Sequence, residues 1–313
     1  MLISTKTPLR ISFVGGGTDL PKYYKKYGGE VIASTINKYI YFFLNKNNKR
    51  NILLKYSKTE NVIKKNDIKH KIAKAILQRY NQSGLEIVSI SDIPARTGLG
   101  SSSAYTVGFL KLMELLNKKK KSKYDLFKIS SKIEIKNFGE RVGKQDHYIS
   151  IYGGFRHIKF LRSGQIVSKK IEMKKNFSSK LEKHMCLIFT GVKRKPNFKF
   201  YNKILKKNDQ NQYLIKKIIN AIKAENIIDF GKVINETWEL KKSNLKKISN
   251  LILKTEKILK TFDIYGLKLL GSGGGGYFLV VGSVDILKKL EKKFKEKYIK
   301  IKFELSGSKQ IKF

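Results

Sequence analysis

The stretch PARTGLGSSSA, Pro94 to Ala104, carries the strongest structural signal in this 313-residue sequence. The apolar, β-prone run Leu85 to Ile90 predicts a strand before it, and Ser101 to Leu116 predicts a helix after it. Between them, Gly98 and Gly100 let backbone N–H groups approach an anion, and the helix N-terminus adds partial positive charge. The pattern therefore predicts a phosphate-binding loop.

This loop differs from a Walker A loop, because no Gly-Lys-Ser/Thr follows the glycines. One of the three serine hydroxyls, Ser101 to Ser103, is suited to ligate a Mg²⁺ ion carried by a nucleotide. The alternative is structural: the serines cap the helix after an ordinary turn.

Two further segments are rich in glycine. In PLRISFVGGGTDLPKY, Pro8 to Tyr23, an apolar strand delivers Arg10, and the glycines lead to Thr18 and Asp19. Asp19 is suited to accept hydrogen bonds from substrate hydroxyls, although an Asp that caps a helix at Leu20 fits the same pattern.

In KLLGSGGGGYFLVV, Lys268 to Val281, four consecutive glycines separate two apolar strands. Such a run is costly in conformational entropy, so it indicates close backbone approach to a ligand or to another loop. A simple hairpin, which needs only one or two glycines, is the alternative.

Two carboxylates lie between these segments, Glu134 on a predicted helix and Asp146 where a helix could begin. Phosphoryl transfer needs one carboxylate that takes a hydroxyl proton and a second that holds Mg²⁺. A single Asp or Glu is usually a solvated surface group, so these two gain weight only from the neighbouring motifs.

The composition shows a strong excess of positive charge, with 67 Lys and Arg against 24 Asp and Glu, a formal net charge of +43. The basic residues are mostly Lys spread along the whole chain, together with Ile, Asn, Phe and Tyr. Codon bias explains this composition, and a polyanion-binding surface is the alternative. Because no basic and aromatic residues alternate as in RNA-binding modules, a nucleic-acid partner is disfavoured.

The single cysteine, Cys186, excludes an internal disulfide and lies in an apolar run, which predicts a small buried hydrophobe. The N-terminus shows no signal-peptide pattern, and no stretch reaches the roughly 20 apolar residues of a membrane span. We therefore expect a cytoplasmic location and no membrane partner.

In their order and spacing, these segments resemble the GHMP kinases, the family named after galactokinase, homoserine, mevalonate and phosphomevalonate kinases. GLGSSSA resembles the family signature, and LLGSGGGGYF resembles its C-terminal glycine motif. Within the family the likeness is to D-glycero-D-manno-heptose 7-phosphate kinases. It is carried by PLRISFVGGGTDLPKYY, VGKQDHYISIYGGF, FTGVKR and TWELKKSNLKKIS. The sequence departs from that group at His147 (usually Gln), at Pro196 and at Ser272 (usually Ala).

The resemblance implies a two-domain α+β fold, with a ribosomal-protein-like N-terminal domain over residues 1–175 and a ferredoxin-like C-terminal domain over residues 176–313. It implies ATP and Mg²⁺, with the site between the domains. Asp146 resembles the catalytic base and Arg10 the group that assists it, while Ser102 and Glu134 resemble the metal ligands. The implied nucleotide-binding residues are Pro94, Gly98, Leu99, Gly100, Ser101, Ser102 and Ser103. The implied substrate-binding residues are Gly16, Gly17, Thr18, Asp19, Gly153, Arg194, Gly274 and Gly275.

The implied reaction transfers the γ-phosphate of ATP to the anomeric hydroxyl of a sugar phosphate, giving a 1,7-bisphosphate from heptose 7-phosphate. A basic cluster at residues 193–199 that includes Arg194 is suited to hold the distal phosphate. The alternatives are a kinase for a neutral sugar of the galactose or fucose type, and a non-catalytic nucleotide- or polyanion-binding protein. The oligomeric state, including a homodimer, is left open.

Overall fold

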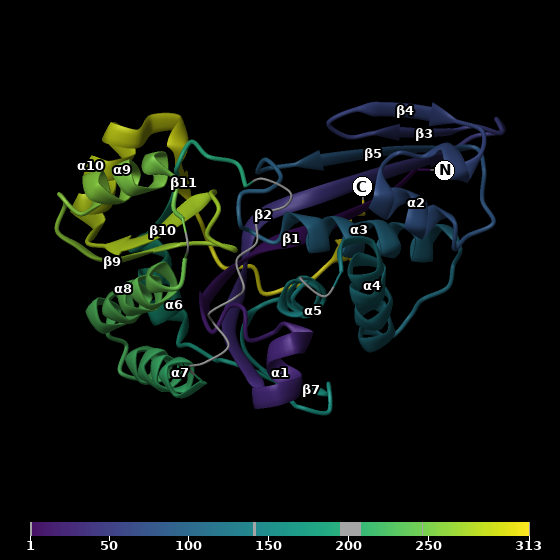
Figure 1. Cartoon of the computed structure of the whole chain (residues 1–313). Coiled ribbons are helices and arrows are strands. Elements are labelled where there is room, and N and C mark those ends of the chain that lie inside the picture. The colour runs from purple at the N-terminus through teal and green to yellow at the C-terminus, as the bar shows by residue number, and fades with distance from the viewer. Residues whose placement is uncertain (1, 140–141, 195–207, 246, 313) are drawn as a thin grey trace.

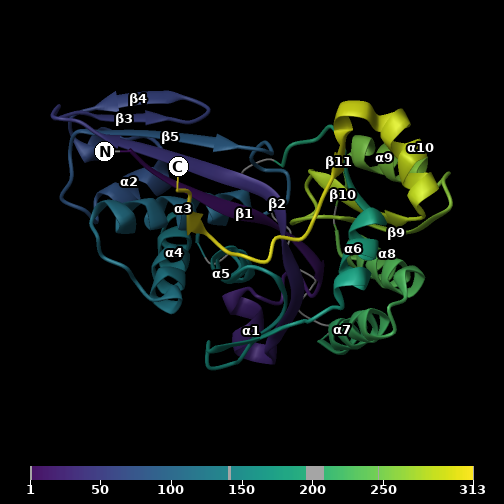
Figure 2. The same cartoon turned by 180° about the vertical axis from the view of Figure 1, so that it is seen from behind.

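The computed structural model describes residues 2–139, 142–194, 208–245 and 247–312 (Figures 1 and 2). Two sheets lie side by side, each covered by helices, with the N-terminal half of the chain in one part and most of the C-terminal half in the other. The predicted α+β class and two-domain GHMP kinase fold are confirmed. The division between residues 175 and 176 stays a prediction.

The first sheet has eight strands in the described chain, in the order β12-β1-β2-β5-β3-β4, with β6 pairing with β2 and β7 with β6. Their bounds are β1 Leu2–Val14, β2 Gly29–Lys46, β3 Ile52–Lys55, β4 Thr59–Val62, β5 Leu85–Ser91, β6 Phe155–Phe160, β7 Ile166–Lys170 and β12 Lys309–Gln310.

The long strand β2 organises this sheet. Residues 29–46 form one continuous strand. One edge of β2 pairs with β1, while the other edge pairs first with β6 and then with β5. The two halves of this one long strand therefore pair with different neighbouring strands.

Helices pack beneath this sheet (Figure 1). Their bounds are α1 Pro21–Tyr27, α2 Lys71–Leu77, α3 Ser101–Leu116, α4 Lys123–Phe138 and α5 Gln145–Tyr152. The helix α3 has the predicted bounds and lies against β1 and β2, with α4 and α5 beside it. Gly108 permits the close contact, because a Cβ there would lie 2.7 Å from Thr7 Oγ1.

The second sheet is antiparallel in the order β11-β8-β10-β9. The strands are β8 Met185–Phe189, β9 Ile264–Leu269, β10 Tyr277–Gly282 and β11 Tyr298–Lys300, and the helices are α6 Lys175–Lys183, α7 Asn208–Lys223, α8 Ile227–Ser243, α9 Asn250–Leu259 and α10 Val284–Phe294. In its core, Trp238 of α8 meets Phe278 edge-on. Cys186 is buried in the same core, as predicted.

The chain ends on the first sheet. The strand β11 ends at Lys300, where the chain leaves the second sheet. Phe303 bridges to Ile36, and β12 pairs with β1 (Figure 2). The last residues therefore tie the two parts of the molecule together.

Candidate active site

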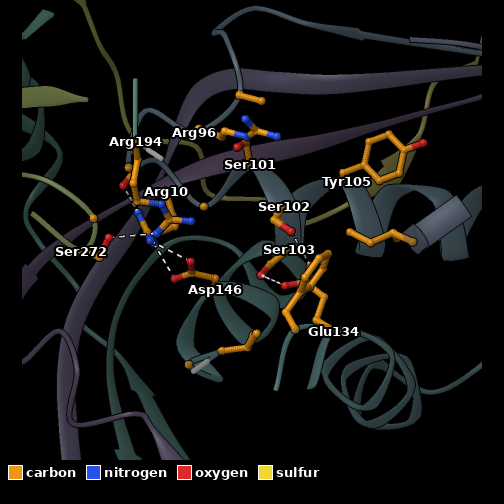
Figure 3. A pocket seen from close by; sticks show the side chains of 18 of the residues that line it. Arg10, Arg96, Ser101, Ser102, Ser103, Tyr105, Glu134, Asp146, Arg194 and Ser272 are labelled. Atoms are coloured by element: carbon orange, nitrogen blue, oxygen red, sulfur yellow. Dashed lines mark hydrogen bonds and ion pairs between the residues drawn. The ribbon is translucent and has the colours of Figure 1, made fainter. Parts of the chain in front are cut away.

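A cleft of about 2290 Å³ lies between the two parts of the molecule. The first sheet and its helices contribute Arg10, the loop before α3 and the start of α5, and the second part contributes residues of α8 and β9. In Figure 3 the labelled side chains of Arg10, Asp146, Arg194 and Ser272 lie close together. We call two groups of residues the β1 side (Arg10, Ser12, residues 15–19 and 143–146) and the α3 side (residues 98–103, Thr106 and Glu134).

On the β1 side, Arg10 and Asp146 form a two-pronged ion pair. Arg10 Nε donates to Asp146 Oδ1 and Nη2 donates to Oδ2, each over 2.7 Å. The third nitrogen, Nη1, donates to the carbonyl of Gly98 over 2.6 Å. The Arg10 side chain is 6% exposed and that of Asp146 22% exposed, so the carboxylate is held rigidly yet reaches the cleft.

Asp19 is buried beside this pair and is fully engaged. Gly17 N donates to its Oδ1 over 3.1 Å, and Gln145 donates from its backbone N to Oδ2 over 3.0 Å and from Nε2 to Oδ1 over 3.2 Å. Burial, followed by the negative charge of Asp146, raises the pKa of Asp19 to about 6. Asp19 does not cap α1, whose N-cap is Leu20 with no side-chain cap. It holds the start of α5 instead.

On the α3 side, the helix begins without a side-chain cap. Its N-cap is Gly100, in a left-handed conformation, so the alternative of serine caps does not hold. In the described chain, the backbone N–H groups of Ser101, Ser102 and Ser103 have no protein acceptor. These groups and the helix dipole are suited to an anion.

The hydroxyls of Ser102 and Ser103 point toward Glu134 (Figure 3). Ser102 Oγ and Thr106 Oγ1 donate to Glu134 Oε1 over 3.2 and 2.6 Å, and Ser103 Oγ donates to Oε2 over 3.3 Å. Burial by itself raises the pKa of Glu134, but His147 and the hydroxyl hydrogen bonds outweigh it and leave the pKa lowered. The carboxylate is therefore held as an anion.

His147 lies behind Glu134 and is completely buried. Its Nε2 is 3.5 Å from Glu134 Oε1, and neither ring nitrogen has a hydrogen-bond partner among the described residues. His147, where the family-like pattern usually has Gln, therefore lies next to the Glu134 carboxylate and does not line the cleft.

Two lysines from the second part reach the cleft. Lys268 of β9 donates from Nζ to the carbonyls of Ser12 and Phe13 over 2.7 and 2.5 Å, at an irregularity in the pairing of β1 with β2. Burial, then the charges of Lys241 and Arg10, lower the pKa of Lys268 well below its usual value. Burial, then Arg10, lower the pKa of Lys241 of α8 to about 7.

The loop before α3, with Gly98, contacts the glycine run between β9 and β10. A Cβ on Gly276 would lie 2.1 Å from the carbonyl oxygen of Thr97, and a Cβ on Gly98 would lie 2.8 Å from that of Leu270. The N–H of Tyr277 also donates to the carbonyl of Thr97 over 3.3 Å. Of the two predicted roles for the glycine run, contact with another loop is the one observed.

Arg194 lies beside the loop before α3. Its backbone N donates to the carbonyl of Arg96, and its Nη1 donates to Ser272 Oγ, both over 3.0 Å. Arg194, Arg96 and Ser272 all line the cleft (Figure 3). Positions 195–199 of the predicted basic cluster, Pro196 among them, lie outside the described residues.

Most of the predicted site residues come together in the cleft. They are Arg10, Gly16, Gly17, Asp19, Pro94, Gly98, Gly100, Ser101, Ser102, Ser103, Glu134, Asp146 and Arg194. Five others do not line it: Thr18, Leu99, Gly153, Gly274 and Gly275.

Internal contacts account for four of those five. Thr18 Oγ1 donates to the carbonyls of Gly15 and Glu30, and the carbonyl of buried Leu99 accepts from the N–H of Arg10. A Cβ on Gly153 would meet the backbone of Ser306 at 2.2 Å, and one on Gly275 would meet that of Val192 at 2.6 Å. These positions therefore serve packing in the described structure.

Several cleft residues were not predicted, among them Ser12, Gln145, Lys241 and Lys268. A sequence signal existed for Lys268, because a lysine inside the apolar strand YGLKLL is unusual unless it has a partner. Ser12 and Gln145 carry no such signal, since isolated polar residues beside a motif are common.

Comparison with known proteins finds similarity to one family of kinases. Residues 61–154 match the family model described as "GHMP kinases N terminal domain". The chain is 29% identical over 299 residues to D-glycero-alpha-D-manno-heptose 7-phosphate kinase of Campylobacter jejuni, covering 88% of each chain. It is also 26% identical over 228 residues to mevalonate kinase of Methanocaldococcus jannaschii, covering 70% of this chain and 69% of that relative.

The fold agrees. A crystal structure of a D-glycero-D-manno-heptose 1-phosphate kinase from Bacteroides thetaiotaomicron matches with a TM-score of 0.82 and 21% identity, covering 99% of both chains. Among the described residues, no helix has the length and apolar character needed to cross a membrane. With its cleft, its paired arginine and carboxylate and its uncapped helix start, the chain contains a GHMP kinase N-terminal domain, and the GHMP kinases are ATP-using phosphotransferases.

Proposed function

We propose that this protein is a sugar kinase that transfers the γ-phosphate of ATP to the anomeric hydroxyl of a sugar phosphate. The preferred acceptor in this proposal is D-glycero-D-manno-heptose 7-phosphate, and the product is the 1,7-bisphosphate. The ion pair between Arg10 and Asp146 at the cleft carries the proposal, because it presents an oriented carboxylate to a hydroxyl.

Asp146 acts as the general base in this proposal. The O–H bond of the acceptor breaks, its proton passes to Asp146, and the freed oxygen bonds to phosphorus as ADP leaves. Arg10 keeps both carboxylate oxygens in place and leaves each a lone pair for the acceptor. The Arg10 bond to Gly98 O links this base to the loop before α3.

The α3 side fits a magnesium nucleotide. The free N–H groups of Ser101 to Ser103 are suited to phosphate oxygens, and Ser102 with Glu134 offers the oxygen ligands that Mg²⁺ takes. When bound, MgATP supplies the phosphoryl group and neutralises its charge. Glu134 contributes as the anion that its lowered pKa indicates.

The proposal of a sugar phosphate as acceptor is supported by the positive charge of the cleft and by the names of similar proteins. Arg10, Arg96 and Arg194 all line the cleft and keep their charge, so it is suited to two anionic reactants together. The two heptose kinases found by comparison are named for a 7-phosphate and a 1-phosphate. We propose that Arg194 holds the acceptor phosphate by charge-assisted hydrogen bonds.

The test is ADP release with MgATP and a panel of acceptors: heptose 7-phosphate, heptose 1-phosphate, free heptose, galactose, fucose and mevalonate. We expect kcat/KM for heptose 7-phosphate to exceed that for free heptose by roughly tenfold or more, because hydrogen bonds to charged groups contribute about 1.5–3 kcal/mol. Arg194→Ala should remove most of this preference. The exposed Arg162, away from the cleft, provides the matched control Arg162→Ala.

Equal use of the free sugar, or preference for galactose or fucose, would contradict the sugar-phosphate acceptor. If Arg194→Ala keeps the preference for heptose 7-phosphate, the phosphate is held elsewhere in the cleft.

A further inference from the structure

Two buried polar atoms on the β1 side of the cleft lack a partner. Ser12 Oγ and Gln145 Oε1 make no hydrogen bond among the described residues, although both residues line the cleft and are only 6% and 7% exposed. A buried, unpaired polar atom costs about 1–3 kcal/mol. Such atoms in a cleft indicate a group that the bound ligand must supply.

The two side chains lie around the same point. A Cβ on Gly16 would be 3.3 Å from Ser12 Oγ and 3.9 Å from Gln145 Nε2, so the missing side chain of Gly16 leaves space between them. Ser12 follows Arg10 by two residues on β1, and Gln145 directly precedes Asp146 on α5. Ser12 and Gln145 therefore lie on the same two elements as the ion pair that holds the base.

Asp19 decides which end of the Gln145 amide is left unpaired. Gln145 Nε2 donates to Asp19 Oδ1, and the backbone N of Gln145 donates to Oδ2. A carboxylate only accepts, so a flipped amide would set two acceptors against each other. Asp19 is thus a positioning residue that leaves Oε1 as an acceptor.

The chemistry of this point selects a neutral hydroxyl. Gln145 Oε1 accepts only, and the Asp19 carboxylate holds the other end of the same amide, so a phosphate oxygen at Oε1 would meet like partial charges. A ligand hydroxyl donates to Oε1 and exchanges a second hydrogen bond with Ser12 Oγ, which both donates and accepts.

We infer that Ser12 and Gln145 bind a second hydroxyl of the acceptor, next to the hydroxyl that loses its proton to Asp146. This inference rests on the proposed kinase function and adds a specificity requirement to it. The acceptor must carry neighbouring hydroxyls, one that reacts and one that is bound.

The first test combines stability and kinetics in Ser12→Ala, Gln145→Met and the control Ser34→Ala. Ser34 is also buried, but its Oγ donates to the carbonyl of Thr35 over 3.0 Å and lies outside the cleft. We expect Ser12→Ala to unfold at the wild-type temperature or higher, because no hydrogen bond is lost, and Ser34→Ala to unfold lower. For the acceptor, kcat/KM should fall roughly 10- to 100-fold in Ser12→Ala and Gln145→Met, with KM for ATP unchanged.

The second test uses monodeoxy analogues of the sugar that the enzyme accepts. The wild type should discriminate roughly 10- to 100-fold against the analogue that lacks the bound hydroxyl, because without that hydroxyl the buried polar atoms stay unpaired. That discrimination should nearly vanish in Ser12→Ala, in Gln145→Met and in Asp19→Asn.

Equal discrimination in wild type and variants would overturn the inference, as would a destabilised Ser12→Ala with unchanged acceptor kinetics. A preference for a neutral sugar contradicts the proposed sugar-phosphate acceptor alone. In that case the ratio of kcat/KM for the sugar to kcat/KM for its deoxy analogue still tests the inference, because the ratio is measured with the sugar that the enzyme accepts.

Discussion

The two sides of the cleft differ in which polar groups they leave unpaired, backbone groups on the α3 side and side-chain atoms on the β1 side. On the α3 side the polar side chains satisfy one another at Glu134, and the N–H groups of Ser101 to Ser103 are left without protein acceptors. On the β1 side the backbone N–H groups of Gly17 and Gln145 bind Asp19, and side-chain atoms are left unpaired.

This difference indicates how the two reactants are recognised. Main-chain groups at a helix start bind any phosphate, whatever molecule carries it. Side-chain atoms on the β1 side change with each substitution, so they are suited to distinguish one acceptor from another. Substitutions on the two sides should therefore affect different kinetic parameters.

The largest effect is expected from Asp146→Asn. We expect the single-turnover transfer rate to fall roughly 10²- to 10⁴-fold, the usual contribution of a positioned general base, while ATP binds nearly normally. Rapid-quench assays and an ATP titration measure the two quantities. Asp67, an exposed carboxylate that also lines the cleft, provides the control Asp67→Asn. A loss below about tenfold would remove Asp146 from the base role.

The contact between the loops is tested by Gly276→Ala. Its Cβ would lie 2.1 Å from the backbone of Thr97, which no rotamer change relieves, so we expect a loss of about 3 kcal/mol in unfolding free energy and a raised KM for ATP. Gly164→Ala is the control. Gly164 has a similar positive φ of 88° but no atom within 4 Å, so only about 1 kcal/mol of backbone strain applies. Equal losses in both variants would exclude a special role for the contact.

Asp19 should make stability depend on pH. Because its pKa is raised to about 6 in the folded state, its stabilising contribution is complete below the unfolded value near 4 and is lost as the pH rises through 6. Asp146, which is paired with Arg10, is the charged group that contributes to this shift. The unfolding free energy of wild type relative to Asp19→Asn should therefore fall by on the order of 2 kcal/mol between pH 4 and pH 7.5. Urea unfolding at several pH values measures it, and a flat difference contradicts the expectation.

The smallest effect is expected on the α3 side. Ser102→Ala should raise the half-saturating Mg²⁺ concentration roughly three- to tenfold, because it removes a hydroxyl that contacts Glu134. Ser101→Ala should change it less, since the Ser101 side chain makes no hydrogen bond in the described structure. Mg²⁺ titration of each variant at fixed ATP provides the comparison. If Ser101→Ala has the larger effect, the metal ligand was assigned to the wrong serine.

The sequence by itself determined the local features. The glycines and helix-forming residues around PARTGLGSSSA predicted the strand β5 and the bounds of α3, because the periodicity and turn residues that decide them lie within a few positions. Arg10 and Asp146 were selected by the resemblance to the GHMP kinases, because a single charged residue carries no such signal by itself.

Only the tertiary structure decided which groups meet. Arg10 and Asp146 are 136 positions apart, and Lys268 reaches Ser12 across 256 positions. The order of the strands and the packing of two sheets create these contacts, and no pattern in a short window encodes them. For this reason the glycine run turned out to contact another loop, Asp19 was found to hold Gln145, and Ser12 was recognised only once its hydroxyl was seen buried and unpaired.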